Sequence, residues 1–206
     1  MDTWQMIRDE RVSFADYLAA LPAESWTRES LCTGWSVTDM VGHMIATTYM
    51  STPRFLGKLA ASGFSFTTMS DKEHRAVTTG RSPEELVELY RSRIDTRSGP
   101  PGPTMTMLGE VLIHSEDVSR ALGGYRDHPM EHLVAVADFY KGNTVLINSK
   151  KRIAGLRLRA TDTDWQAGSG PEISGPLVAL VLAMTGRTVA LDDLTGDGLA
   201  ELRARS

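Results

Sequence analysis

Two residues that can bind a metal lie four positions apart in the segment 104–122. Glu110 and His114 fall on one face of any helix that forms there, one turn apart. Their neighbours in the segment are largely apolar, so this helix borders the core. A carboxylate and an imidazole beside a core are costly unless they pair or ligate a metal. The spacing therefore indicates either a pair that stabilises the helix or two ligands of one metal ion.

His43 offers a third ligand from a second apolar segment, which Ser36 opens. It shares a helical stripe with Met40, Thr47 and Met50. Two ligands from one helix and a third from its neighbour form a known kind of metal site in helical bundles. Three protein ligands leave one coordination position of zinc open, which is the catalytic arrangement. The alternative for His43 is a hydrogen-bonded histidine in the core or at its edge.

The other three histidines lie in polar surroundings. His74 belongs to the charged run Asp-Lys-Glu-His-Arg, and His128 and His132 flank a helix start beside acidic residues. We expect all three at the surface. The single cysteine, Cys32, is expected to be a small buried apolar residue, and Trp35 is expected to anchor its loop by packing.

Two longer motifs contain the three candidate ligands. Residues 32–43 read Cys-Thr-Gly-Trp-Ser-Val-Thr-Asp-Met-Val-Gly-His, and residues 110–123 read Glu-Val-Leu-Ile-His-Ser-Glu-Asp-Val-Ser-Arg-Ala-Leu-Gly. In this order and separation they resemble the mycothiol-dependent maleylpyruvate isomerase family of the DinB-like superfamily. Residues 175–187, which end in Gly-Arg, and the turn at 194–198 resemble the C-terminal part of that family. Residues 55–80 carry no part of the resemblance.

The resemblance implies one divalent metal ion, zinc, bound by His43, Glu110 and His114. Many members of the wider superfamily use three histidines, whereas the middle ligand here is a glutamate, as in the isomerase branch. Imidazole and carboxylate groups are a ligand set that zinc accepts.

Two further residues receive functions from the resemblance. Asp117 would accept the free N–H of a histidine ligand, and its alternative is an exposed helix carboxylate beside Arg120. Arg187 would hold a substrate carboxylate above the metal by a fork of hydrogen bonds. Its alternative is to cap the C-terminus of a helix, which the preceding Gly186 favours.

The chemistry expected of such a site follows from the metal. Zinc with an open position binds a thiol and favours its thiolate near neutral pH. A thiolate can attack an electrophile, or it can add reversibly to an activated double bond and so allow cis–trans isomerisation. We therefore expect an enzyme that activates a low-molecular-weight thiol, mycothiol by the resemblance, for S-transfer or isomerisation. Two alternatives need the same ligands: a hydrolase that uses zinc-bound water, and a non-catalytic metal-binding protein.

Hydrophobic spacing predicts the helices that would position these residues. Ser36 followed by Asp39 is typical of a capped helix start, and Ser82 followed by Pro83 is another. Residues 57–80 have too weak a pattern to assign. The predicted helices cover residues 3–20, Ser36 to just before Pro53, Ser82 to just before Gly99, 104–122 and 129–147.

The pattern changes near Lys150. Apolar and basic residues alternate over 156–160, which predicts a strand. Further predicted elements are short strands at 165–167 and 172–174, an apolar helix at 176–185 closed by Gly186, a strand at 188–191 and a short helix at 198–204. With the resemblance, this predicts a mainly α fold, in which residues 1–150 form a DinB-like metal-binding four-helix bundle and residues 151–206 form a small α+β domain.

The composition is that of an ordinary globular protein, because 41% of the 206 residues are apolar and 23% are charged. A net charge of −4 and the lack of a Lys/Arg run give no basis for nucleic-acid binding. The charged N-terminus differs from a signal peptide, and the longest apolar run, 177–184, is too short to span a bilayer. One cysteine permits no intramolecular disulfide. We expect a cytoplasmic enzyme of actinobacterial type whose partners are a small thiol and a small electrophile, without nucleic acid or membrane.

Overall fold

The computed structural model describes residues 2–144 and 147–205. The chain divides into two compact units, Met1–Asp127 and His128–Ser206. The first unit is helical throughout. Its elements are α1 (Thr3–Ala19), the 3-10 helix η1 (Ala23–Thr27), α2 (Val37–Thr48), α3 (Thr52–Ala61), α4 (Phe66–Thr78), α5 (Pro83–Arg91) and α6 (Thr104–Ala121).

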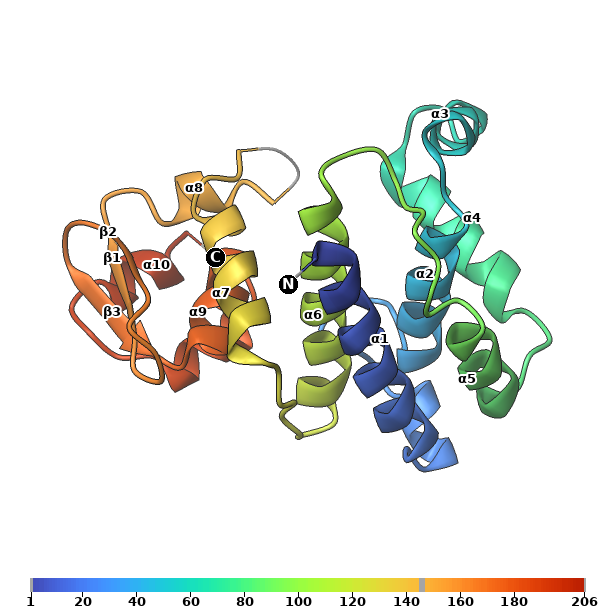
Figure 1. Ribbon diagram of the computed structural model, residues 1–206, viewed down its shortest axis with the longest axis horizontal. Coiled ribbons are helices and arrows are strands. Elements are labelled where there is room, and N and C mark those ends of the chain that lie inside the picture. Colours follow the sequence, from blue (N-terminus) through green and yellow to red (C-terminus); the bar gives the residue numbers. More distant parts are fainter. Residues whose placement is uncertain (1, 145–146, 206) are drawn as a thin grey trace. The chain divides into compact units, whose positions relative to one another are not determined.

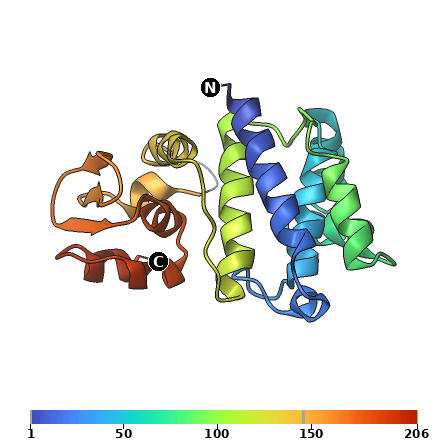
Figure 2. The same ribbon diagram turned by 60° about the horizontal axis from the view of Figure 1, so that its bottom comes forward.

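Helices α1, α2, α5 and α6 form a bundle (Figures 1 and 2). Helix α1 packs against α5 and α6, and α2 packs against the same two helices. The apolar stripe of α1 is completely buried at Ile7, Phe14 and Leu18, and the Phe14 ring meets Tyr90 of α5 edge to face, with ring centroids 5.8 Å apart. The predicted mainly α fold is therefore confirmed. All four bundle helices were predicted, but α5 ends at Arg91 and not just before Gly99.

A buried arginine fixes the connection that follows α5. Arg11 lies in the apolar face of α1 and is 1% exposed. Its Nη1 donates to the backbone carbonyl oxygens of Arg93, Ile94 and Thr96, at 3.5, 3.1 and 2.8 Å. These bonds satisfy carbonyl groups that no helix pairs, and they hold residues 93–96 against α1.

Helix α2 begins as the sequence predicts. The Ser36 hydroxyl accepts a hydrogen bond from the Asp39 amide at 3.2 Å, and the Asp39 carboxylate accepts one from the Ser36 amide at 3.0 Å. This reciprocal pair is a capping box and satisfies two amides at the helix start. It fixes the start of the helix on which His43 lies.

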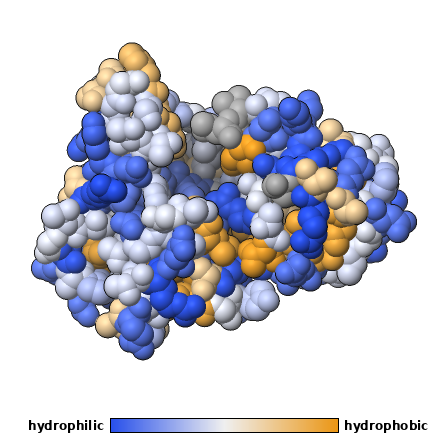
Figure 3. Space-filling model, turned by 180° about the vertical axis from the view of Figure 1, so that it is seen from behind, coloured by the Kyte–Doolittle hydropathy of each residue, from blue (hydrophilic) through white to orange (hydrophobic). Residues whose placement is uncertain are grey.

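Residues 57–80, which the sequence left unassigned, belong largely to α3 and α4. Helix α3 has no buried residue, and α4 buries only Met69, Ser70 and His74. Neither helix therefore contributes a wide face to the core. Apolar side chains instead lie exposed in this region, visible as orange at the upper left of Figure 3; the exposed ones are Leu56, Phe64 and Phe66.

Helix α4 packs against α2, and Gly42 is the point of close approach. A Cβ atom at Gly42 would overlap the Cγ2 atom of Thr78 and lie 3.1 Å from the carbonyl oxygen of His74. Only glycine permits this separation of the two helices. The residue that follows Gly42 is the candidate ligand His43.

We expect Gly42→Ala to destabilise the protein by about 1–3 kcal/mol, the cost of inserting a methyl group into a packed contact. Gly57→Ala is the matched control, because Gly57 lies in the exposed helix α3 and its added Cβ would meet nothing within 4 Å. That control should gain up to about 1 kcal/mol through helix propensity. Urea unfolding followed by circular dichroism measures the free energy of unfolding of both variants. A Gly42→Ala variant as stable as the parent would show that α2 and α4 separate easily.

The second unit contains a small sheet and several short helices. Its elements are α7 (Met130–Tyr140), α8 (Ser149–Arg152), β1 (Arg157–Ala160), β2 (Gln166–Gly168), β3 (Glu172–Gly175), α9 (Leu177–Met184), the 3-10 helix η2 (Thr188–Asp193) and α10 (Leu199–Arg203). Strand β1 is central, antiparallel to β2 and parallel to β3. Helix α9 packs against the sheet and against α7.

Two of the elements predicted for this unit are wrong. The helix predicted over 129–147 ends at Tyr140. The strand predicted at 188–191 is part of η2, where the adjacent residues Ala190 and Leu191 are both fully buried, whereas a half-buried strand would alternate. The expected boundary at 150 places α7 in the bundle, but α7 packs against α9 and falls in the unit His128–Ser206. Among the described residues, no helix is long and apolar enough to cross a membrane.

Candidate metal centre

The three candidate ligands lie together where α2 packs against α6. His43 Nε2 is 3.7 Å from Glu110 Oε1. The rings of His43 and His114 meet edge to face, with centroids 5.3 Å apart. Two ligand atoms about 2 Å from a tetrahedral zinc ion are roughly 3.4 Å apart, so the first separation is close to that of two ligands of one ion.

Each histidine has its Nδ1 atom hydrogen-bonded to a neighbour. His43 Nδ1 is 3.2 Å from the Ser70 hydroxyl, and His114 Nδ1 is 2.9 Å from Asp117 Oδ2. When Nδ1 carries the proton of such a bond, Nε2 is the nitrogen left with a free lone pair. Metal-binding histidines in proteins are commonly held in this way.

Glu110 provides the test of whether a cation fits. Its Oε1 atom is buried and has no hydrogen-bond partner among the described residues. Burial raises the pKa of Glu110, while His114, a hydrogen bond from Thr47 and the charge of Arg11 act in the opposite direction. A buried carboxylate oxygen without a partner is costly, and a divalent cation would satisfy it. The residues present therefore fit a metal ion.

The two histidines differ in their electrostatics. Burial, with smaller effects of His114 and His74, lowers the pKa of His43 to about 3. Burial also lowers the pKa of His114, but hydrogen bonds with Asp117 and Cys32 and the charges of Asp117 and Glu110 outweigh it and raise the pKa to about 9. His43 is thus held neutral, the form that ligates metals, and His114 is made strongly basic.

Asp117 is completely buried, so the alternative of an exposed helix carboxylate is wrong. Its Oδ2 atom accepts hydrogen bonds from His114 Nδ1 and from the Cys32 thiol, whose Sγ is 3.4 Å away. Its backbone carbonyl accepts from the Leu31 amide at 3.1 Å. The loop that precedes α2 is therefore attached to α6 beside the candidate ligands.

Cys32 differs from its prediction, because it is partly exposed and its thiol makes a polar contact. Cys32, His114 and Asp117 each offer a ligand atom within 4.8 Å of the others, so they could also hold a metal. The 2.9 Å separation of Nδ1 and Oδ2 is that of a charge-assisted hydrogen bond, which favours a supporting role for this group. The sequence feature that pointed to this group was Cys32, the first residue of the motif at 32–43.

His74 is 3% exposed, so its expected surface position is wrong. Its Nδ1 lies 3.2 Å from Asp39 and its Nε2 lies 3.5 Å from Asp71. The Trp35 ring packs on both His74 and His43, at centroid separations of 4.7 and 5.1 Å, which agrees with its expected packing. The charged sequence around His74 gave no sign that one face of α4 packs against α2.

Two residues of the second unit, His132 and Arg187, were also given positions or functions from the sequence. His132 is 1% exposed, so its expected surface position is also wrong. Arg187 immediately precedes η2, and its Nη1 donates to the carbonyl oxygen of Thr185 at 3.4 Å. That contact fits the capping alternative, and the role of Arg187 in substrate binding stays a prediction.

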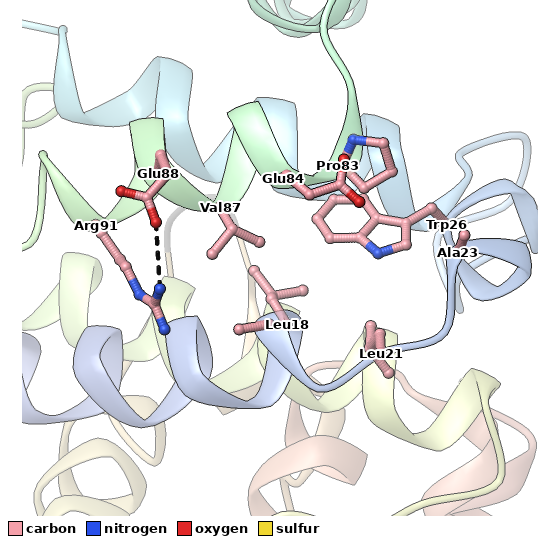
Figure 4. A pocket seen from close by; sticks show the side chains of 10 residues that line it. Leu18, Leu21, Ala23, Trp26, Pro83, Glu84, Val87, Glu88 and Arg91 are labelled. Atoms are coloured by element: carbon pink, nitrogen blue, oxygen red, sulfur yellow. Dashed lines mark hydrogen bonds and ion pairs between the residues drawn. The ribbon is translucent and has the colours of Figure 1, made fainter.

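A pocket of about 190 Å³ lies elsewhere in the first unit, between the end of α1, η1 and the start of α5. Figure 4 shows its apolar side, formed by Leu18, Val87 and Trp26, and the ion pair of Glu88 and Arg91 at its edge. None of the candidate ligands lines this pocket, so we assign it no part in the chemistry.

Comparisons with known proteins agree with the fold described above. Residues 7–100 match the family model described as the mycothiol maleylpyruvate isomerase N-terminal domain. Two solved structures are similar over 95% of this chain and 91% of theirs, at 19% identity: the mycothiol-dependent maleylpyruvate isomerase, with a TM-score of 0.62, and its histidine-to-alanine mutant, with 0.63. This likeness shows a shared fold. No curated protein matches the chain.

Proposed function

We propose that the protein is a metal-dependent enzyme that activates a small thiol, because residues 7–100 match the family model of the mycothiol maleylpyruvate isomerase N-terminal domain. The observation that carries the proposal is the buried, unpartnered Oε1 atom of Glu110, 3.7 Å from His43 Nε2. We propose His43, Glu110 and His114 as the ligands of one zinc ion. Mycothiol is the proposed thiol, as in the structures of similar fold.

The two histidines and Glu110 have different roles at this site. His43 and His114 would bind the ion through Nε2, since Nδ1 of each is already hydrogen-bonded. Glu110 would supply the one negative charge among the ligands. When bound, zinc would supply a positive charge that favours the thiolate form of a thiol. The side chains of His43, Glu110 and His114 are 15%, 16% and 19% exposed, so none of the three is completely buried.

The reaction proposed is S-transfer to a small electrophile or its cis–trans isomerisation. In isomerisation the thiolate sulfur bonds to one carbon of an activated double bond, the former double bond rotates, and expulsion of the same thiolate restores the double bond. No atom is gained or lost, so the thiol is a true cofactor. We propose that Arg187 pairs with a carboxylate of the substrate, because a guanidinium binds carboxylates in a bidentate manner.

The direct test is metal analysis of the purified protein, followed by titration of the zinc-loaded protein with mycothiol. We expect about one zinc per chain and a thiol that ionises at lower pH when bound, measured by thiolate absorbance. Failure to bind zinc after reconstitution would refute the proposal. Zinc binding without any effect on the thiol would favour the hydrolase, which an ester substrate would reveal, or a metal-binding protein without catalysis.

Asp117→Asn should weaken zinc binding about 10–100-fold, the usual cost of losing a carboxylate that supports a histidine ligand. The asparagine keeps the size of the side chain but loses the charge that makes His114 basic. Asp71→Asn is the matched control, since Asp71 also lies beside a histidine, His74, that is not a proposed ligand. Competition with a chelator of known affinity measures both variants. Equal affinities would remove Asp117 from its supporting role.

A further inference from the structure

Helix α4 brings one hydroxyl group to the candidate metal centre. Ser70 is 7% exposed, and its Oγ lies 3.2 Å from Nδ1 of His43. It comes from the part of the chain that carries no motif, and it reaches His43 because α4 approaches α2 closely at Gly42. We propose that Ser70 is a positioning residue that accepts the Nδ1 proton of His43 and keeps Nε2 free for the metal.

The surroundings of His43 Nε2 indicate which atom donates in the hydrogen bond between His43 Nδ1 and Ser70. If Ser70 donated to Nδ1, the proton of neutral His43 would be on Nε2. That N–H would face Glu110 Oε1 at 3.7 Å, which is too far for a hydrogen bond. With the proton on Nδ1, the imidazole N–H is paired with Ser70, and Nε2 presents a lone pair beside Glu110. The second arrangement pairs the imidazole N–H and leaves His43 Nε2 and Glu110 Oε1 as two acceptors that face each other, which is the arrangement that a metal ion between them requires.

The two histidines thus have supports of different charge. His114 is held by the carboxylate of Asp117, and His43 is held by the neutral hydroxyl of Ser70. Glu110 and Asp117 together carry two negative charges, which one divalent cation balances when both histidines are neutral. A second supporting carboxylate would add a buried charge without a partner, at considerable cost. A hydroxyl orients His43 without that cost.

The imidazole nitrogen signals of His43 in the metal-free protein test this assignment by NMR. We expect the parent to have its proton on Nδ1, and Ser70→Ala to show a mixture of the two tautomers. Ser70→Thr keeps the hydroxyl and should restore the parent tautomer. Thr68→Ala removes an exposed hydroxyl from the same helix and should change nothing. A parent protein with the proton on Nε2, or an unchanged tautomer in Ser70→Ala, would overturn the proposal.

Zinc affinity is the second measurement. We expect Ser70→Ala to bind zinc about 10–100-fold more weakly and Ser70→Thr to recover most of that loss. An Ala variant with the affinity of the parent would contradict a positioning role. The inference about zinc rests on the proposed function, but the tautomer does not. If zinc never binds and the tautomer still depends on Ser70, the proposed function fails and the positioning of His43 by Ser70 stands.

Discussion

Replacing either His43 or His114 by alanine is expected to abolish zinc binding at ordinary concentrations. Each change removes one of three proposed ligands, so the loss should exceed the roughly 100-fold upper cost of removing a supporting residue. The fold should survive, because the bundle core consists of apolar side chains that neither histidine supplies. Zinc titration measures the affinity, and circular dichroism with thermal unfolding measures the fold.

Two variants make this prediction specific. Glu110→Gln keeps the shape of the side chain but loses the charge, so its affinity should lie between those of the parent and the histidine variants. Arg187→Ala should bind zinc as the parent does and handle substrate poorly, because a guanidinium pairs with carboxylates but does not ligate zinc. If Arg187→Ala lost zinc as severely as His114→Ala, the proposed ligand set would be wrong.

Arg11→Ala is expected to destabilise the protein by about 3–5 kcal/mol, the range for removing one member of a buried polar network. The substitution leaves the carbonyl oxygens of Ile94 and Thr96 without their donor, while that of Arg93 still accepts from the Thr96 amide, and it opens a cavity in the face of α1. Each buried acceptor left unpaired costs about 1–3 kcal/mol. Chemical unfolding of the metal-free protein gives the free energy directly.

Arg8→Ala is the matched control for Arg11→Ala. Arg8 lies on the same helix and pairs with Asp95, but the two side chains are 47% and 80% exposed. An exposed ion pair contributes about 1 kcal/mol or less. Equal losses in the two variants would mean that the Arg11 hydrogen bonds are replaced by water, and that residues 93–96 are not held by this side chain.

The parts of the site that the sequence predicted are those with local signals. The i, i+4 spacing of Glu110 and His114 places both on one face wherever a helix forms. The capping box at Ser36 and Asp39 sets where α2 begins, and with it the position of His43. Both features depend on neighbours within one helical turn. The sequence alone was therefore enough to propose that Glu110, His114 and His43 form one site.

The parts that the sequence could not predict depend on contacts between distant segments. Ser70 and His74 are buried because α4 packs against α2, and the few apolar residues of α4 gave no basis for expecting that contact. Cys32 meets Asp117 across 85 positions of the chain. The strand wrongly predicted at 188–191 shows a related limit, since a short apolar run does not distinguish a strand from a 3-10 helix.

Helix α3 is weakly attached to the rest of the first unit. It has no buried residue, packs against α4 and is joined to it by the ion pair of Lys58 and Glu73. A helix so weakly attached opens at a small fraction of the free energy of global unfolding, so its amide protons should exchange with solvent long before those of α2 and α6. Substitutions there change little packing, so α3 can diverge between relatives without moving the candidate ligands His43, Glu110 and His114.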